Sequence, residues 1–351
     1  MEQVLITINA DRSEIYFGSA DSEREMRIIE GSENYRLLLA NGQGWLIVAG
    51  RDAEGIVTKL ARIMGLCPHG GETLPRLVLV RGEENASEAK RRFQASGGHE
   101  GDSRSKWTVR DLGGLFLWSH PEAIDLICDL GPAEVYEEET TGMVRCLSPI
   151  YHEAVLSGGL HLHAALLEYR GNGVLIAASS GKGKSTCCSR VNSPWRPICD
   201  DNVLVVIGED GRFYAHPLPT WSEFFDRVSE RTWRVESYLP LSAIFFLEQD
   251  MKNKTLSIGR GHAVVLLTEF STQFFNIYST SREETEKRAY NKLVFQNACR
   301  LADAVPSYIL QASIEGWFWK EMEQVLPPFG RKNLDDKVTC QATMNRLSTY
   351  G

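Results

Sequence analysis

One run of residues constrains the fold of this chain more than any other feature. Residues 173–188 read GVLIAASSGKGKSTCC, an apolar segment followed by small and polar residues. The apolar residues 174–177 predict a buried strand, and the serines and glycines after them favour a tight loop. Lys184, Ser185 and Thr186 then predict the first turn of a helix. A strand, a glycine-rich loop and a helix in this order predict a phosphate-binding loop in an α/β protein.

The predicted loop carries the chemical groups that a nucleotide needs. Its backbone N–H groups and the positive end of the helix dipole favour a polyphosphate. Lys184 is expected to reach the outer phosphates, and the hydroxyl of Ser185 is expected to ligate a magnesium ion. The alternative is an ordinary strand, turn and helix with lysines on the surface. The pattern predicts nucleotide contacts from Ser179, Ser180, Gly181, Lys182, Gly183, Lys184, Ser185 and Thr186.

One position departs from the pattern G-x-x-x-x-G-K-[ST]. Its first glycine is replaced by Ala178. Glycine is usual at such positions because it reaches backbone conformations that other residues avoid. We expect alanine to be tolerated here, provided that its φ is negative.

Groups on both sides of the loop extend the pattern. His163 stands ten residues before the run, and Asp200 and Asp201 begin fifteen residues after Ser185. With the strand G-V-L-I and the loop S-G-x-G-K-S between them, residues 163–206 resemble the HPr kinase/phosphorylase family. That family is one of the phosphoenolpyruvate-carboxykinase-like P-loop kinases. An Arg-Gly-Leu-Gly type motif of those enzymes is not recognisable, so the resemblance is to a divergent member from a peptide-modification cassette.

The resemblance implies a fold, an activity and roles for single residues. It implies a mixed-sheet P-loop kinase domain that uses ATP and Mg²⁺ to phosphorylate a Ser or Thr hydroxyl of a peptide or small protein. It also implies a homo-oligomer, because the resembling kinases assemble into rings. By resemblance, Asp200 is the catalytic base with His163 as its neighbour. Lys184 contacts the transferred phosphoryl group, and Asp201 holds the magnesium ion together with Ser185.

Elementary chemistry supports two roles for the two carboxylates. Adjacent side chains on a strand point to opposite faces, so Asp200 and Asp201 are expected to act separately. Two carboxylates near a polyphosphate also call for a divalent cation between them. The alternatives are a turn that uses Asp for local hydrogen bonds and a histidine that only packs. His161, on the same strand face as His163, competes for its assignment, and His216 could line a substrate groove or merely end a strand.

Composition bounds the class of protein and its partners. A chain of 351 residues, 43% hydrophobic and 24% charged, suits two globular domains, here expected at residues 1–150 and 151–351. The net charge of −8 argues against nucleic acid as a partner. Neither a signal peptide nor a membrane-length apolar run is recognisable, so no membrane partner is expected. Eight cysteines without a C-x-x-C pair predict reduced thiols in a cytoplasmic protein.

Local patterns predict further elements along the chain. Residues 82–106 are polar and are expected to form a mobile connection, either disordered or a binding loop. The aromatic residues 317–319 are expected in the core, and residues 208–211 predict a hairpin turn. Further strands are expected at residues 4–8, 35–39, 76–80, 114–118, 134–136, 143–147, 202–207, 212–215 and 241–247, and helices at residues 55–64, 151–156, 283–303 and 314–325.

Three classes of function compete on this basis. The leading hypothesis is the kinase. The second is a non-catalytic nucleotide- or peptide-binding partner protein in a peptide-modification pathway, against which the Asp pair and His163 argue. A G-protein-like switch is disfavoured because no N-K-x-D sequence follows the loop.

Overall fold

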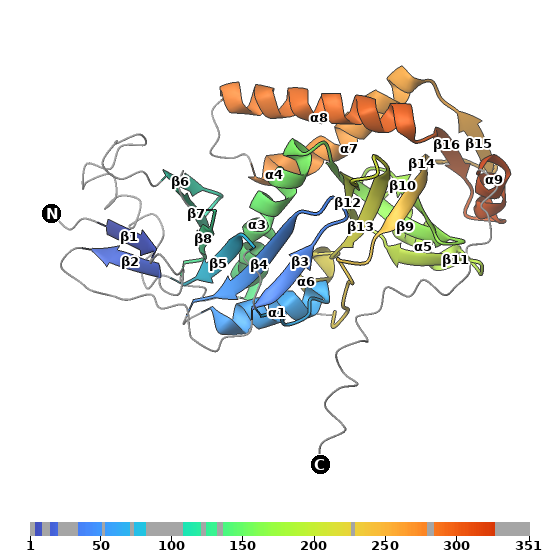
Figure 1. The fold of residues 1–351 in the computed structure, drawn as a ribbon. Coiled ribbons are helices and arrows are strands. Elements are labelled where there is room, and N and C mark those ends of the chain that lie inside the picture. Colours follow the sequence, from blue (N-terminus) through green and yellow to red (C-terminus); the bar gives the residue numbers. More distant parts are fainter. Residues whose placement is uncertain are drawn as a thin grey trace, which may run out of the picture.

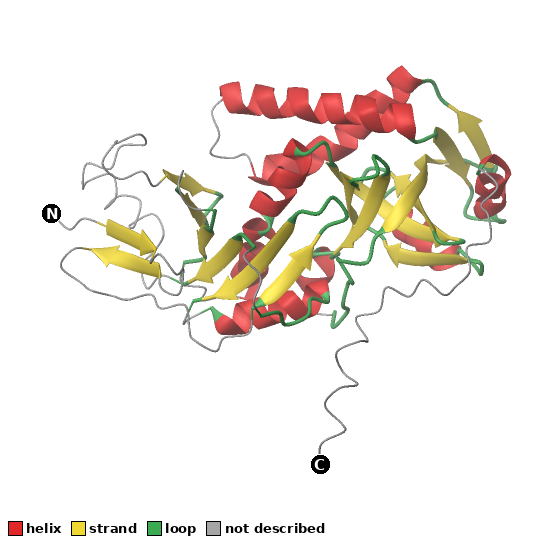
Figure 2. Cartoon of the chain, viewed as in Figure 1, coloured by secondary structure: helices red, strands yellow, loops and turns green. Residues whose placement is uncertain are grey.

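The protein is described by a computed structural model that combines two mixed β-sheets with helices (Figure 1). The structure describes residues 4–8, 15–19, 34–50, 53–70, 74–81, 108–120, 124–131, 136–225, 229–278 and 284–326. The α/β class expected from the sequence is confirmed, and Figure 2 shows helices packed beside the strands of both sheets. The polar connection expected at residues 82–106 lies outside the described residues.

The N-terminal half builds a six-stranded sheet in the order β3-β4-β5-β8-β7-β6. β4, β5 and β8 are parallel, while β3, β6 and β7 pair antiparallel with their neighbours. A separate antiparallel hairpin joins β1 and β2. The strands are β1 (Val4–Ile8), β2 (Ile15–Ser19), β3 (Tyr35–Leu38), β4 (Gly44–Ala49), β5 (Arg76–Val80), β6 (Thr108–Asp111), β7 (Phe116–Ser119) and β8 (Leu126–Asp129).

The C-terminal half builds an eight-stranded sheet that closes on itself. Its order is β10-β9-β12-β13-β14-β16-β15, β11 pairs with β9, and β10 also pairs in parallel with β14. β10, β9, β12, β13 and β14 therefore form a closed circuit. The strands are β9 (Leu160–Tyr169), β10 (Asn172–Ala177), β11 (Trp195–Cys199), β12 (Asn202–Ile207), β13 (Phe213–Leu218), β14 (Leu239–Gln249), β15 (Lys254–Ser257) and β16 (Ser307–Ala312).

Helices cover the sheets and connect them. In Figure 1, α4 stands between the two sheets, while α7 and α8 run side by side along one edge of the molecule. The amphipathic α1 buries Ile56, Leu60 and Met64 and ends at Gly65, whose φ of 65° forms the left-handed cap. The helices are α1 (Glu54–Met64), α3 (Tyr136–Cys146), α4 (Ser148–Leu156), α5 (Lys184–Arg190), α6 (Ser222–Phe225), α7 (Arg260–Tyr278), α8 (Glu284–Ala304) and α9 (Phe318–Val325).

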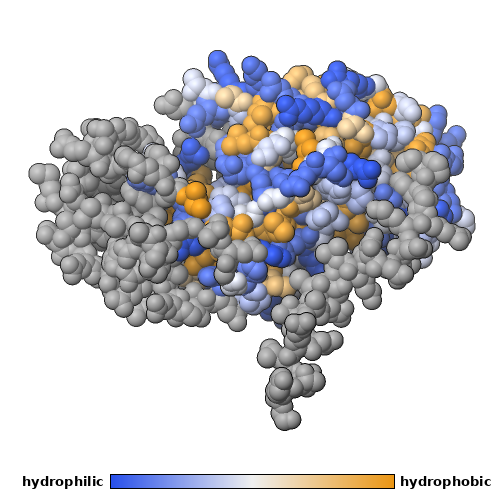
Figure 3. All heavy atoms as spheres, in the orientation of Figure 1, coloured by the Kyte–Doolittle hydropathy of each residue, from blue (hydrophilic) through white to orange (hydrophobic). Residues whose placement is uncertain are grey.

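One apolar core runs across the predicted domain boundary at residue 150. The same buried cluster contains Leu60 of α1, Tyr151 of α4, Leu204 of β12 and Leu301 of α8. On the face shown in Figure 3, hydrophobic residues are scattered among hydrophilic ones. No helix within the described residues is both long and apolar enough to cross a membrane.

Several expected elements differ from those observed. The prediction of a strand at residues 143–147 was wrong, because Met143 and Cys146 belong to α3 and are buried one helical turn apart. Tyr136 begins the same helix, while residues 134–135 of that expected strand lie outside the described residues. α9 begins at Phe318, four residues later than expected, and Trp317 before it is 66% exposed rather than in the core.

Candidate functional site

The glycine-rich loop lies between the carboxyl end of β10 and the first turn of α5. β10 ends at Ala177 and α5 begins at Lys184, as expected from the sequence. Gly181 and Gly183 have φ values of 75° and 99°, and a Cβ atom at either position would meet only open space. Among the described residues only Arg170 combines a side chain with positive φ, so Ala178 does not. The backbone condition on which alanine was expected to be tolerated there is therefore met.

Lys184 is folded against the loop that precedes it. Its Nζ atom donates to the carbonyl oxygen of Ala178 at 2.8 Å and approaches that of Ser179 at 3.4 Å. The residue is only 6% exposed, and burial lowers the pKa of its ammonium group. The negative charges of Asp201 and Asp200 act in the opposite direction. Both carboxylates therefore lie near enough to interact electrostatically with Lys184.

The two carboxylates have different partners. Oδ1 of Asp201 lies 2.9 Å from Nε2 of His163, and Oδ2 accepts a hydrogen bond of 2.6 Å from the Asn202 amide. Oδ1 of Asp200 accepts a hydrogen bond of 2.7 Å from the hydroxyl of Thr220. The two carboxylates thus have separate hydrogen-bond partners, although both residues lie in the turn between β11 and β12 and not on a strand. His163, expected beside Asp200, contacts Asp201 instead.

Sheet pairing explains why His163 reaches Asp201. β9 and β12 are antiparallel, and His163 lies directly opposite Asn202, the residue after Asp201. The backbone N–H of Ala164 also donates to the carbonyl oxygen of Asp201 at 3.1 Å. Two adjacent strands therefore hold the histidine and the carboxylate, which are far apart in the sequence, in contact.

Asp200 interacts electrostatically with a residue of α5. Its charge raises the pKa of the Cys188 thiol, an effect second only to burial. Ser185 and Cys188 are three residues apart on α5, a spacing that puts two side chains on one face of a helix. Asp200 therefore lies near enough to α5 to interact electrostatically with Cys188, three residues after Ser185.

A comparison with models of protein families shows to which family the chain belongs. The family model described as SynChlorMet cassette protein ScmC matches residues 126–327, which is more than half of the chain. The chain belongs to the ScmC family. No curated protein matches the sequence.

Membership of the ScmC family corrects the family expected from the sequence. The matching model is not that of the HPr kinase/phosphorylase family, and no kinase family matches. The resemblance rested on short motifs, and a strand, a G-K-S loop and an Asp pair are features that the chemistry of phosphate binding demands of unrelated proteins. The ScmC description names a cassette and no reaction.

The described residues of the ScmC chain do not form a metal site made of protein side chains alone. Among the described residues, no group of three or more His, Cys, Asp or Glu side chains could hold a metal ion. A site of Ser185 and one carboxylate nevertheless suits Mg²⁺, which usually binds one or two carboxylates and completes its shell with waters and substrate phosphates. Ser185 and one Asp side chain are therefore of the chemical type that would hold a magnesium ion brought in with a nucleotide.

The buried cysteines of this ScmC protein are packing groups. Burial raises the pKa of Cys187 to about 11 and that of Cys199, beside Asp200, to about 12. A thiol with such a pKa carries almost no thiolate at neutral pH and is a poor nucleophile. Cys199 is 1% exposed and belongs to the apolar core.

His216 also proves to be structural. It is fully buried, Nε2 accepts from the backbone N–H of Ala40 at 3.0 Å, and Nδ1 lies 2.7 Å from the carbonyl oxygen of Val235. Burial lowers its pKa to about 4, so the ring is neutral. The ring joins β13 to the segment after β3 and does not line a substrate groove.

Sequence reasoning missed two residues that orient the carboxylates. Asn202 and Thr220 hold Asp201 and Asp200, respectively. Asn202 directly follows the Asp pair, and this adjacency could have pointed to it. Thr220 is twenty residues from Asp200 and is brought there by the β12–β13 hairpin, so no local signal marked it.

Proposed function

We propose that this ScmC-family protein is a Mg²⁺- and ATP-dependent kinase that phosphorylates a Ser or Thr hydroxyl of a peptide or small protein. One observation carries the proposal: the glycine-rich loop and the Asp pair, which begins sixteen residues after Lys184, meet at this lysine. The loop carbonyl oxygen of Ala178 accepts a hydrogen bond from its ammonium group, and the charges of Asp201 and Asp200 act on it. Phosphoryl transfer requires these groups together, namely a phosphate cradle, a metal ligand and a proton acceptor.

The loop residues are proposed to hold the nucleotide. Gly181 and Gly183 lie in left-handed conformations with open space beside them, which lets backbone N–H groups approach phosphates. Lys184 is proposed to exchange its bond to the Ala178 carbonyl for the outer phosphates. That exchange replaces a neutral partner by a charged one, which strengthens the hydrogen bond.

The pair of Asp201 and His163 is proposed as the proton acceptor. Their side chains are 32% and 12% exposed, so a hydroxyl on a flexible substrate can reach them. In the reaction the acceptor O–H bond breaks and its proton passes to the pair, while the oxygen forms a bond to the γ-phosphorus and ADP leaves with the bridging oxygen. His163 acts as a positioning residue that fixes Asp201 and shares its proton.

Asp200 is proposed as the magnesium ligand, together with Ser185. The charge of Asp200 acts on Cys188, which follows Ser185 by three residues on α5, and Thr220 orients the Asp200 carboxylate, as outer hydrogen bonds commonly do for metal ligands. Bound Mg²⁺ would neutralise phosphate charge. These roles reverse those inferred by resemblance, because His163 pairs with Asp201.

The direct test compares ATP binding by the native protein and by Lys184→Ala. Hydrogen bonds to charged groups contribute about 1.5–3 kcal/mol, so calorimetry in excess Mg²⁺ should show roughly 10- to 100-fold weaker binding. Lys252→Ala, in the exposed turn before β15, is the matched control and should bind ATP as the native protein does. Equal ATP affinity in Lys184→Ala would contradict the proposal.

Transfer itself is tested by intact mass. The native protein is incubated with MgATP and with blocked peptides that contain one Ser or Thr, and each peptide is examined for an added phosphoryl group. ATP binding without transfer to any peptide would favour the alternative of a non-catalytic nucleotide-binding partner protein.

A further inference from the structure

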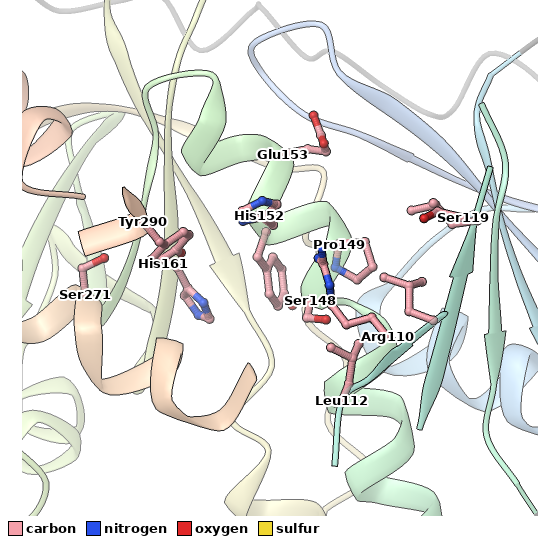
Figure 4. Close-up of a pocket in the computed structure, with 13 residues that line it drawn as sticks. Arg110, Leu112, Ser119, Ser148, Pro149, His152, Glu153, His161, Ser271 and Tyr290 are labelled. Carbon is pink, nitrogen blue, oxygen red and sulfur yellow. The ribbon is translucent and has the colours of Figure 1, made fainter. Parts of the chain in front are cut away.

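A second concave site lies between the two sheets. It is a pocket of about 240 Å³ whose walls come from β6, β7 and β8 on one side, from α4 and β9, and from α7 and α8 on the other (Figure 4). None of the loop residues 178–186 lines it. The pocket is therefore lined by both halves of the chain and is separate from the glycine-rich loop.

His161 connects this pocket to the proposed proton acceptor. It lines the pocket from β9, and His163 lies two residues further along the same strand. Side chains two apart on a strand share a face and lie about 7 Å from each other. The charges of Asp201 and His163 both act on the His161 ring. The pocket is thus adjacent to the pair that would accept the substrate's proton.

The lining of the pocket suits a flat apolar group. The ring of Tyr151 lies 4.7 Å from that of His161, and Tyr290 stacks on His152 with centroids 5.5 Å apart. The buried Leu112, which directly follows β6, and Leu117 of β7 complete the apolar part. Aromatic rings pack well against tilted and stacked rings of this kind.

The size and rim of the pocket restrict what can enter. A volume of about 240 Å³ is smaller than that of most small-molecule sites. It holds one side chain but not a nucleotide. Arg110 from β6 is exposed, and Glu153 from α4 and Ser119 from β7 are half-buried, so the rim is polar and suits a peptide backbone.

We propose that this pocket binds an aromatic side chain of the peptide substrate, close to the Ser or Thr that receives the phosphoryl group. The inference rests on the proposed kinase function. In an extended peptide, side chains two residues apart are also about 7 Å from each other. An aromatic side chain against His161 therefore brings a hydroxyl two residues away to His163 and Asp201.

The first test measures binding of short peptides to the full chain by calorimetry. The probes are Gly-Ser-Gly-Phe-Gly and Gly-Phe-Gly-Ser-Gly with blocked ends, each paired with a version in which Phe is replaced by Ala. One of the Phe peptides should bind about 10- to 100-fold more tightly than its Ala version, the factor expected from burying one aromatic side chain. Equal binding of the Phe and Ala versions would overturn the proposal, as would free phenylalanine binding as tightly as the peptide.

A matched pair of variants places the binding in this pocket. Ser119→Tyr fills the rim, whereas Thr108→Tyr changes its cross-strand neighbour, which does not line the pocket; both lose the same hydroxyl contact of 2.8 Å. Ser119→Tyr should abolish the preference for Phe and Thr108→Tyr should keep it. A Phe preference that survives in Ser119→Tyr would overturn the proposal.

A second pair of variants tests whether a change in peptide binding comes from the filled pocket or from a folding defect. Ser271→Leu fills the pocket from α7, and Thr268→Leu on the same helix leaves the pocket unchanged. ATP affinity should be native in all four variants. Because peptide binding is measured without transfer, the absence of any Phe preference in the native protein, with normal ATP binding, refutes the pocket alone, whereas undiminished ATP binding in Lys184→Ala refutes the kinase alone.

Discussion

Two histidines on the strands that flank β12 have contrasting surroundings. β12 lies between β9 and β13, with His163 opposite Asn202 on one side and His216 opposite Leu204 on the other. His216 is fully buried and both its nitrogens meet backbone groups, whereas His163 is partly exposed and meets a carboxylate. A histidine bound only by backbone holds parts of the fold together, while one that shares a proton with a carboxylate open to solvent can do chemistry.

We expect the largest change in turnover from replacing Asp201, the carboxylate beside His163. Asp201→Asn keeps the shape of the side chain but removes the proton acceptor, and general-base catalysis contributes about 10²–10⁴-fold. Turnover in a phosphotransfer assay should fall by that factor, with ATP affinity little changed. Asp200→Asn is the matched variant and should weaken Mg²⁺-dependent nucleotide binding. The opposite pattern would restore the roles inferred by resemblance, with Asp200 as base and Asp201 as metal ligand.

His216→Ala should affect stability rather than turnover. The change leaves the N–H of Ala40 and the carbonyl of Val235 buried without the ring, and it creates a cavity. We expect a loss of about 3–5 kcal/mol in the free energy of unfolding, measured by urea titration. His163→Gln is the comparison and should cost less than about 1 kcal/mol in unfolding while lowering turnover. If both variants lose stability alone, the contrast between the two histidines is wrong.

Acid should weaken the fold through His216. Its pKa is about 4 in the folded protein and about 6.5 in an unfolded chain, so the unfolded state binds the proton first as pH falls. Stability should be complete above pH 6.5 and should drop by about 3 kcal/mol by pH 4. Urea titrations at several pH values test this. A His216→Leu variant should lack that part of the decline, and an identical pH dependence would contradict the assignment.

The smallest effect concerns the loop itself. Ala178 does not need a glycine conformation, so Ala178→Gly should only add freedom to the unfolded chain. The free energy of unfolding should fall by about 0.4–1 kcal/mol. ATP affinity, measured by calorimetry, should stay the same. A large gain in ATP affinity would show that alanine strains the loop.

Local sequence patterns predicted the loop and its neighbours well. β10, the start of α5 and the β12–β13 hairpin were all found, because apolar runs and turn residues there act over a few positions. α7 was not predicted, since its apolar residues around 263–267 form an unbroken run without helical periodicity. Met143 and Cys146 were read as a strand although their spacing suits a helix.

The partners of the site residues were harder to predict than the residues themselves. That His163 meets Asp201 rather than Asp200 depends on the register between β9 and β12, which no local pattern encodes. The pocket between the sheets gave no sequence signal at all. Its lining extends from Arg110 to Tyr290, and only the tertiary fold brings these residues together.

The position of β10 has a consequence for the newly made chain. β10 needs β9 on one side and β14 on the other, and its partner Leu241 is translated 64 residues after Ala177. At about 5–20 residues per second, the ribosome takes on the order of 3–13 s to cover that distance. During this delay the apolar strand has an open edge that can pair with other chains. The loop thus matures late in synthesis, and codon choice or chaperones acting between β10 and β14 should influence the yield of active protein.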